Sequence, residues 1–528
     1  SLSTKRRDKV WRRSVKGQSV ETKCEDKVWR QGVETKCGDK VRGQGVETSF
    51  IDNGRCVTYP SRMTFDEARR RLEAESQGHV LRFWEQLDDT QRSNLLEQIS
   101  TLDLGLVGRM RSQLGDWLKS KDTTAAEPEP AGVVKLADDR RAVATLRGES
   151  ALRAGEVGVL LVAGGQGSRL GFDGPKGAYP IGPVSDAVLF YFHARKVLAL
   201  SKAYDTTVPF YIMTSASNDA ATRACFEEHK WFGLNPEAVF FFKQGMWPAL
   251  DAEGRLILEA PDRLFMSPDG HGGTLSALQT SGGLDDMVRR GLSTIFYFQV
   301  DNPLVEVADP AFIGMHLFEE AELSVKVCAK RDPEEGLGMV VQRDGRCEMI
   351  EYTELTREQK YRRREDGSLY FNYGSVAIHL FQLDFLRREA SVEMPMHIAH
   401  KKIPFCGDDG KVVKPDKPNG YKFEKFIFDH LPHANKVLNV AFDRADEFSP
   451  VKNAKGPDSP ETCRRDLIAK WGRWFDAIGI ELPRDAGGHP AIPIEIDPFY
   501  ARTPAQLRER LRDGPLPDLN APVWLKET

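Results

Sequence analysis

The sequence has no long apolar run, no paired cysteines and no strong net charge. In its 528 residues no apolar stretch approaches the roughly 20 residues that a membrane-spanning helix needs. The eight cysteines are scattered, without the C-x-x-C pairs of zinc sites or the pattern of a disulfide framework. The N-terminus lacks the apolar segment of a secretory signal. We therefore expect a cytoplasmic protein with reduced thiols and no membrane partner.

Charge and length narrow the class further. The formal net charge is -4, and charged residues make up 29% of the chain. This balance gives no overall basic field, so we expect no nucleic-acid partner. The length suffices for about two to four domains with a sizeable core.

Residues 1–62 differ in composition from the rest. The tripeptide Val-Glu-Thr recurs at Val20, Val33 and Val46. These short repeats carry few apolar residues and could not bury a core. We predict a disordered, repeat-bearing extension here, translated from upstream sequence, with Met63 as the natural start. N-terminal sequencing of the native protein tests this.

The rest of the chain is typical of an α/β protein. Residues 63–150 are predicted to form a helical region with two amphipathic helices and a polar, proline-bearing linker. Apolar runs that read as strands then alternate with helical patterns. Such alternation predicts a mostly parallel sheet with helices on both faces. We place the catalytic domain at 151–400 and a C-terminal region at 401–528. The strands are expected at 157–162, 208–213, 239–242 and 295–300, and helices at 187–201 and 220–229.

A glycine-rich loop follows the strand Val157–Val162 and carries two cations, Arg169 and Lys176. Glycines let the backbone approach a ligand, and the cations can neutralise phosphate oxygens. The order of residues does not fit a dinucleotide fingerprint, because Leu170 stands where the third glycine belongs, and a P-loop lysine is also absent. The loop predicts a nucleoside triphosphate site. The alternative is a flexible surface loop.

Two further loops follow predicted strands. The amide of Gln244 could bind a base edge, or the residue could lie in a plain turn. Residues 268–273 form a second glycine loop, with Gly270 and His271, that could lie against a ligand or be a simple turn. Asp301 ends the strand 295–300 and could hold Mg²⁺, although an Asp or Asn before proline also often caps a helix.

Polar residues near other strand ends are candidates for a sugar site. Glu351, Tyr352 and Asn372 could hydrogen-bond sugar hydroxyls, or could simply be solvated. The lysine-dense segment 414–425 is followed by Phe426 and Phe428. A charge run of this kind is usually a solvated face.

Taken in order, these motifs resemble the eukaryotic-type UDP-N-acetylglucosamine pyrophosphorylases within the UDP-sugar pyrophosphorylase family. The resemblance extends from about Met63 to about Asn453. It rests on the segments LVAGGQGSRLG with PKG, QGMWPAL, PDGHGG, VDNPLV with ADPAFIG, KPDKPNGYKFEKFIFD and DEFSPVKNA.

The resemblance implies a GT-A-like nucleotidyltransferase domain, with a Rossmann-like, mixed and mostly parallel sheet, an N-terminal helical region and a small C-terminal part. It implies transfer of uridylate from UTP to a sugar 1-phosphate with Mg²⁺, N-acetylglucosamine 1-phosphate being the expected sugar. It implies uridine and triphosphate contacts from Val162, Ala163, Gly164, Gly165, Arg169, Lys176, Gln244, Gly270 and Lys422, with Asp301 on the metal. The implied sugar-phosphate residues are His271, Gly338, Glu351, Tyr352, Asn372, Phe426, Phe428 and Lys452, and the implied catalytic cations are Arg169, Lys176 and Lys422.

Two positions depart from the family pattern. His271 stands where the family usually has an asparagine that touches the sugar, and glucose-directed relatives often have Gly-His-Gly at this loop. Tyr373 stands where the family has alanine. Both leave glucose 1-phosphate open as the alternative substrate.

Two other classes stay open. A GT-A sugar transferase typically needs an Asp-x-Asp pair, which Asp301-Asn302-Pro303 lacks. A non-catalytic sensor of UDP-sugars would need the base contacts but not the four cations Arg169, Lys176, Lys422 and Lys452. We expect a monomer or a weak homo-oligomer.

Overall fold

The computed structural model describes residues 63–119, 127–136, 138–512, 514 and 516–527, and of the earlier residues only four strands. These are β1 (Val10–Val15), β2 (Gln18–Lys23), β3 (Ser49–Asp52) and β4 (Arg55–Thr58), hydrogen-bonded in the order β2-β1-β3-β4. The sequence analysis named no strand in residues 1–62. The rest of that predicted extension, and most of the predicted linker, lie outside the described residues.

The chain divides into two compact units, and both are discontinuous in sequence. One comprises Ser1–Ser112, Leu250–Phe265 and Lys402–Asp416, and the other comprises Gln113–Ala249, Met266–Lys401 and Lys417–Thr528. The boundaries predicted at 150 and 400 do not coincide with this division, and they stay a prediction. Composition changes along a chain cannot reveal segments that leave one unit and return to it later.

The described part of the first unit is mainly helical. It contains α1 (Phe65–Ala74), α2 (Asp89–Thr101) and the first half of α3 (Leu104–Lys119), with the 3₁₀ turns η1 (Gly78–Leu81) and η2 (Trp84–Gln86). The later insertions add the strand pairs β11 (Leu258–Ala260) with β12 (Arg263–Leu264) and β20 (Phe405–Cys406) with β21 (Val412–Val413).

Local sequence explains where these helices begin. Thr64 and Glu67 cap α1 reciprocally, since each side chain accepts a hydrogen bond from the other's backbone N–H. Leu72 and Leu95 are fully buried, as the apolar spacing predicts. The prediction of two helices missed α3. That helix contains three glycines, which lower helix propensity.

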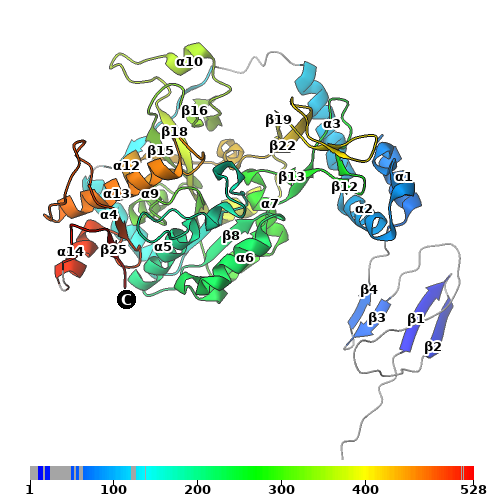
Figure 1. Cartoon of the computed structure of the whole chain (residues 1–528), viewed down its shortest axis with the longest axis horizontal. Helices are drawn as coiled ribbons and strands as arrows, with labels where there is room; N and C mark the ends of the chain where they lie inside the picture. Colours follow the sequence, from blue (N-terminus) through cyan, green and yellow to red (C-terminus); the bar gives the residue numbers. More distant parts are fainter. Residues whose placement is uncertain are drawn as a thin grey trace, which may run out of the picture. The chain divides into compact units, whose positions relative to one another are not determined.

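A central sheet dominates the second unit, as expected (Figure 1). Its strand order is β6-β23-β15-β18-β14-β7-β8-β9, with β16, β17 and β5 attached beside β18. Five of the seven neighbouring pairs along this path are parallel, and only the two pairs that involve β18 are antiparallel. The mostly parallel sheet is thus confirmed. The bounds are β5 (Glu129–Pro130), β6 (Val134–Lys135), β7 (Val157–Val162), β8 (Phe210–Thr214), β9 (Val239–Lys243), β14 (Thr294–Gln299), β15 (Leu323–Ala329), β16 (Met339–Arg343), β17 (Arg346–Ile350), β18 (Tyr373–Gln382) and β23 (Val437–Ala441).

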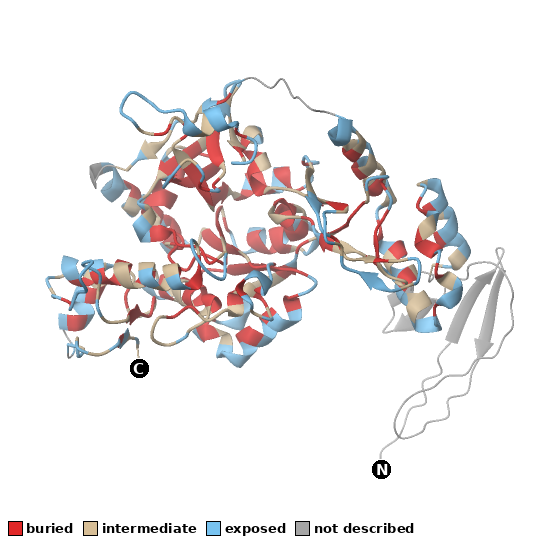
Figure 2. Cartoon of the chain, turned by 45° about the horizontal axis from the view of Figure 1, so that its top comes forward, coloured by how far each residue is buried: buried red, intermediate tan, exposed pale blue. Residues whose placement is uncertain are grey.

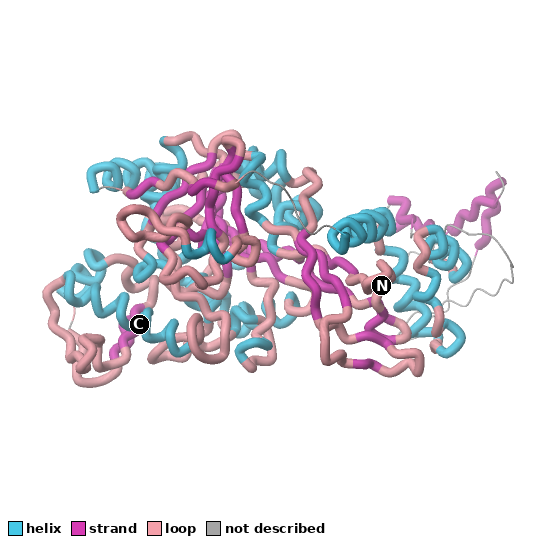
Figure 3. The backbone as a smooth tube through the Cα atoms, turned by 90° about the horizontal axis from the view of Figure 1, so that it is seen from above, coloured by secondary structure: helices cyan, strands magenta, loops and turns pink. Residues whose placement is uncertain are grey.

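Helices pack on both faces of this sheet (Figure 3). Five helices cover one face: α4 (Asp138–Arg153), α5 (Leu189–Ala203), α6 (Asp219–Glu228), α9 (Pro310–Phe318) and α13 (Pro460–Ala477). The other face is covered by α7 (Thr274–Thr280), α8 (Gly283–Arg289), α11 (Leu383–Glu389) and the 3₁₀ helix η8 (Ile427–His433). The helices predicted at 187–201 and 220–229 are thus confirmed as α5 and α6.

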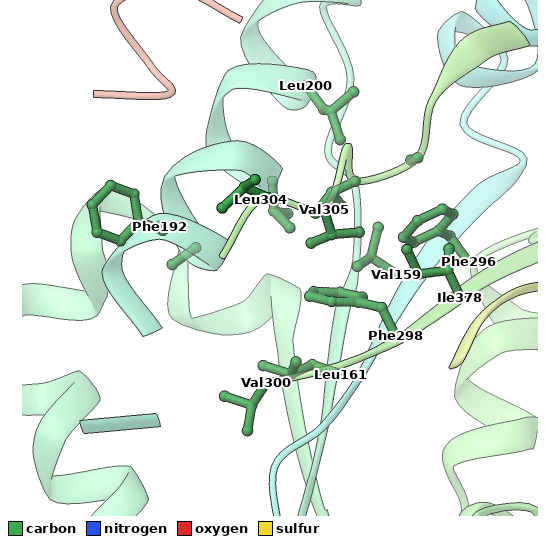
Figure 4. Packing of buried hydrophobic residues seen from close by; sticks show 14 of the residues in the cluster. Val159, Leu161, Phe192, Leu200, Phe296, Phe298, Val300, Leu304, Val305 and Ile378 are labelled. Atoms are coloured by element: carbon green, nitrogen blue, oxygen red, sulfur yellow. The ribbon is translucent and has the colours of Figure 1, made fainter. Parts of the chain in front are cut away.

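The alternation of side chains along β7 and β14 produces two separate cores. Val159, Leu161 and Phe298 point into the core under α5, which Figure 4 shows, whereas Leu160 and Tyr297 point into the opposite core. All five are almost completely buried, and Figure 2 shows the centre of this unit in the colour of buried residues. Strands buried on both faces read as continuous apolar runs, which is why the sequence signal was clear.

The remaining elements are short. They are η3 (Ser168–Leu170), η4 (Lys176–Ala178), η5 (Lys230–Gly233), η6 (Pro236–Ala238), η7 (His271–Gly273), β10 (Met246–Pro248), β13 (Met266–Pro268), α10 (Arg357–Tyr361), β19 (His397–Lys401), β22 (Gly420–Glu424), α12 (Arg444–Glu447), β24 (Ile494–Ile496), α14 (Pro504–Arg512) and β25 (Val523–Leu525).

The helices α4 and α9 approach each other unusually closely through two glycines. A Cβ atom on Gly314 would lie 1.8 Å from the carbonyl oxygen of Ala144, and one on Gly148 would lie 1.9 Å from that of Pro310. Any side chain at either position would force the two backbones apart. No helix among the described residues is both long and apolar enough to cross a bilayer.

Candidate active site

The glycine-rich loop begins directly at the end of β7. The N–H of Ala163 donates to Met213 at 2.8 Å, so the loop leaves the sheet from its carboxyl edge. Asn218 holds the next turn in place, because its amide donates to the carbonyl oxygens of Ala163 (2.8 Å) and Gly165 (3.2 Å). Gly165 is exposed, and a Cβ added there would meet no atom within 4 Å. Gly165 therefore presents bare main chain to open space.

Gln244 lies against this loop. A Cβ atom on Gly164 would lie 2.7 Å from Gln244 Nε2. Gln244 is buried, and its backbone N–H donates to the carbonyl oxygen of Thr214 at the end of β8. The structure therefore brings together two segments that the sequence analysis assigned to one nucleotide.

The loop folds back on itself, which returns Lys176 to its start. The N–H of Lys176 donates to the carbonyl oxygen of Gly165 at 3.0 Å, and Gly171 permits the turn with a φ of 70°. Lys176 Nζ then lies 3.5 Å from Asp301 Oδ2, and both side chains are largely buried. A cation and a carboxylate thus meet at the carboxyl ends of β7 and β14, where ligands of parallel sheets bind.

The other two predicted triphosphate cations lie on separate elements. Arg169 is exposed on η3. Lys422 is half-buried in β22, and burial lowers its pKa. Their convergence on the same phosphates as Lys176 stays a prediction.

Asn302, next to Asp301, is not a helix cap. Its amide nitrogen donates to Glu447 O at 2.7 Å, and its oxygen accepts from the N–H of Ser449 at 3.1 Å. The N-cap of α9 is instead Asp309. The alternative assignment of a cap at residues 301 and 302 is therefore wrong, because α9 begins later at Pro310.

The Asn302 side chain and the backbone of Asp301 hold the segment that carries Lys452. The N–H of Val451 donates to the carbonyl oxygen of Asp301 at 2.8 Å. Nearby, Lys326 Nζ donates to both carboxylate oxygens of Glu447 at 2.6 and 2.7 Å, and both residues are buried. Burial raises the pKa of Glu447, and the charge of Lys326 counteracts this effect. The buried pair fixes the chain just before Lys452.

A pocket of about 140 Å³ lies beside Asp301. It is lined by residues from separate segments of the second unit, including six predicted site residues: His271, Asp301, Gly338, Glu351, Phe428 and Lys452. Tyr352, Asn372 and Phe426 are not among the lining residues. Tyr352 is 38% exposed and lies beside Gly336, which lines the pocket, and its sugar contact stays a prediction.

His271 has a defined tautomer. The N–H of Ile427 donates to His271 Nδ1 at 3.1 Å. A backbone N–H can only donate, so the neutral ring carries its proton on Nε2. Burial lowers the pKa of His271 to about 4, so the ring is neutral near pH 7. Its ring stacks on Phe426 with centroids 5.4 Å apart. Nε2–H is thus a fixed, uncharged donor.

Glu351 forms an acidic part of the same pocket. Burial raises its pKa, and the nearby Glu354 adds to this effect. A Cβ on Gly338 would lie 2.9 Å from Met349 Sδ and 3.6 Å from Glu351 Oε1. A larger residue than glycine at 338 would therefore crowd this side of the pocket.

Sequence reasoning missed several supporting residues. Asp269 is 3% exposed, its Oδ1 has no hydrogen-bond partner, and burial raises its pKa to about 6. A Cβ on Gly245 or Gly273 would lie 2.4 or 2.3 Å from this carboxylate. His397 Nε2 lies 2.9 Å from Asp429 Oδ2. Asp269 and Asp429 lie within quoted motif segments and His397 lies outside them, and no local pattern marks any of the three as a supporting residue.

The sequence matches a family profile described as UTP--glucose-1-phosphate uridylyltransferase over residues 122–457. The chain belongs to this family. It is 36% identical over 468 residues to the mouse UDP-N-acetylhexosamine pyrophosphorylase-like protein 1, covering 82% of this chain and 92% of that protein. It is 40% identical over 344 residues to the Saccharomyces cerevisiae UDP-N-acetylglucosamine pyrophosphorylase, covering 63% and 72%.

A solved structure supports the same assignment. The uridine diphosphate N-acetylglucosamine pyrophosphorylase from Trypanosoma brucei, in complex with an inhibitor, is 28% identical. It superposes with a TM-score of 0.73 over 88% of this chain and 98% of that one. The expected nucleotidyltransferase fold and the resemblance stated from the motifs are confirmed.

Proposed function

We propose that this family member transfers uridylate from UTP to a sugar 1-phosphate, giving a UDP-sugar and pyrophosphate. The observation that carries the proposal is a single arrangement. Open main chain after β7, the Lys176–Asp301 pair and the pocket with His271 and Glu351 belong to one unit, at the carboxyl ends of parallel strands.

The uridine would lie against the backbone of residues 162–165. Gln244 packs on Gly164, so its amide can bind a base edge, which distinguishes bases by paired donors and acceptors. Gly270, which has a φ of 86°, would add a main-chain contact from the second glycine loop. These contacts would orient the nucleotide and take no part in proton transfer.

The reaction is a direct displacement at phosphorus. A phosphate oxygen of the sugar 1-phosphate attacks the α-phosphorus of UTP, and the bond to the β,γ-diphosphate breaks, so pyrophosphate leaves. The nucleophile is already an anion and needs no general base. Two like unit charges 4 Å apart repel by about 4 kcal/mol at an effective dielectric near 20. Positioned cations must offset this repulsion, and Arg169, Lys176, Lys422 and Lys452 are the proposed ones.

The residues present fit a magnesium ion. Mg²⁺ typically takes one or two protein carboxylates and completes its shell with water and substrate phosphates. Asp301 offers a carboxylate at the rim of the pocket, and Lys176 beside it can balance charge on the same phosphates. When bound, the ion would neutralise the charge of the triphosphate.

N-acetylglucosamine 1-phosphate is the proposed sugar substrate, as the names of the relatives suggest. Nε2–H of His271 can donate to a sugar or phosphate oxygen, and Glu351 can accept from a hydroxyl group. Glucose 1-phosphate is the second candidate, because His271 and Tyr373 depart from the family pattern and the matching profile carries the glucose name. Pocket contacts of about 1–3 kcal/mol decide between such substrates.

Release of pyrophosphate tests the proposal. The full chain is mixed with UTP, Mg²⁺ and one of four sugar 1-phosphates: N-acetylglucosamine, N-acetylgalactosamine, glucose or galactose. We expect pyrophosphate and UDP-N-acetylglucosamine in the first mixture, and none when UTP or sugar is omitted. Turnover with glucose 1-phosphate alone would support the second candidate. Binding of UDP-sugar without any pyrophosphate would indicate a sensor instead.

A further inference from the structure

A cluster of two histidines and one glutamate lies outside the pocket described above. His430 Nδ1 and His433 Nδ1 both point to one oxygen of Glu389, Oε2, at 3.1 and 2.7 Å. Their candidate ligand atoms all lie within 4.8 Å of one another. Among the described residues, these three form the one group of histidine, cysteine and carboxylate side chains close enough together to hold a metal ion.

The local fold explains why these side chains converge. His430 and His433 are three residues apart on η8, and side chains at i and i+3 of a 3₁₀ helix lie on the same face. Glu389 is the last residue of α11, which packs in the same core as η8. Two elements from different parts of the chain therefore bring three potential metal-ligand atoms close together.

We propose that Glu389, His430 and His433 bind a zinc ion, with water in the fourth position. Two His and one carboxylate are a known ligand set for zinc, which prefers tetrahedral geometry. At Zn–N and Zn–O distances near 2.0–2.1 Å, two tetrahedral ligand atoms lie about 3.3 Å apart. The observed separations of 3.1 and 2.7 Å are both shorter than this value, the second by about 0.6 Å, so the ligand atoms would move apart slightly around an ion.

The two imidazole rings differ in burial and in the surroundings of their second nitrogen atoms. His430 is 1% exposed, and its Nε2 atom has no hydrogen-bond partner. On zinc binding, the proton of each ligating Nδ1 moves to Nε2 of the same neutral ring, so no oxidant or further reactant is needed. His433 is 35% exposed in its side chain, which gives a metal ion access from solvent.

Arg388 orients the carboxylate without occupying the ligand oxygen. Its Nε lies 3.4 Å from Glu389 Oε1, the other oxygen. Its guanidinium charge is balanced by Glu322, which it contacts through both Nη atoms at 2.7 and 2.9 Å. Outer partners of this kind commonly hold metal ligands in place. Oε2 therefore remains available for the metal.

The ion would brace the wall of the substrate pocket. Ile427, the first residue of η8, donates to His271, and Phe428 lines the pocket. Zinc at the other end of η8 would tie this helix to α11. Its role would be structural, and it would be distinct from the magnesium ion at Asp301.

Metal titration of the full chain tests the site. Chelator-treated protein is titrated with Co²⁺, and then with Zn²⁺ in competition. We expect one equivalent of cobalt with the visible d–d bands of a four-coordinate site, without the near-ultraviolet band of a thiolate ligand. The absence of such a site in the wild-type protein would overturn the proposal.

Variants locate the ion. H433A and E389Q should each weaken binding by at least about 100-fold, since loss of a ligand should exceed the 10–100-fold effect of an outer partner. H489A, which removes an exposed histidine elsewhere, should bind as the wild type does. Zinc should also raise the Tm of the wild type and H489A, but not of H433A. Unchanged binding in H433A would mean an adventitious ion only.

Because Glu389 is buried, E389Q could fail to fold. His433 is partly exposed, so H433A decides the question, with its far-ultraviolet circular dichroism and metal-free Tm compared with the wild type. Neither outcome depends on turnover, so the zinc site and the proposed uridylyltransfer stand or fail separately.

Discussion

Removal of Lys176 should slow the reaction strongly. At the 3.5 Å separation from Asp301, one positive charge interacts with one negative charge by about 5 kcal/mol at an effective dielectric near 20. This value is an upper limit, because water screens part of it. A triphosphate oxygen at a similar distance would lose a comparable interaction in K176A, and Asp301 would lose its counter-charge.

Loss of a single preorganised donor typically lowers kcat by about 10²–10³-fold. We therefore expect K176A to reduce kcat at least about 100-fold, which corresponds to about 2.7 kcal/mol of transition-state stabilisation. The KM for UTP should change less, since repulsion is greatest when both anions meet. Steady-state pyrophosphate release gives both constants.

A matched control separates this effect from a general loss of charge. Lys202 on α5 is also ion-paired, with Glu527 at 3.0 Å, but lies at the surface with a half-exposed side chain. K202A should turn over as the wild type does. If K176A stays within about threefold of the wild type while folding normally, the assigned role of this cation is incorrect.

Three further predictions concern stability, measured by chemical denaturation. G314A should lower the free energy of unfolding by about 1–3 kcal/mol through overpacking against α4, whereas G115A, where a Cβ meets nothing within 4 Å, should not destabilise. K326M should cost about 3–5 kcal/mol, because it leaves Glu447 buried without its partner; an unchanged midpoint would contradict this. Burial lowers the pKa of His316 to about 3, so the unfolded state binds the proton first and stability falls as the pH drops below about 6.5. H316Q should flatten this slope, and an identical pH profile would refute the assignment.

The strands of the central sheet were predictable because they are buried on both faces. β7 and the centre of β14, Ile295–Phe298, are apolar, and the glycine loop follows β7 at once. The rule that ligands bind at carboxyl ends of parallel strands then gave the region of the site. These signals are local in sequence, so they can be recognised in a single sequence without an alignment.

Other features depend on contacts between distant segments. Asn218 holds the glycine loop, and Asn302 holds the segment before Lys452 from 145 residues away. Neither residue carries a local pattern that indicates its partner. The same reason explains why the discontinuous units and the pairing of β23 within the sheet were not predicted.

A crystal structure of the chain with UDP-N-acetylglucosamine tests the central claim most directly. The account predicts the uracil ring against the main chain of residues 162–165 beside Gln244, the diphosphate near Lys176, and the sugar between His271 and Glu351. A nucleotide bound elsewhere, or a sugar outside this pocket, would contradict it.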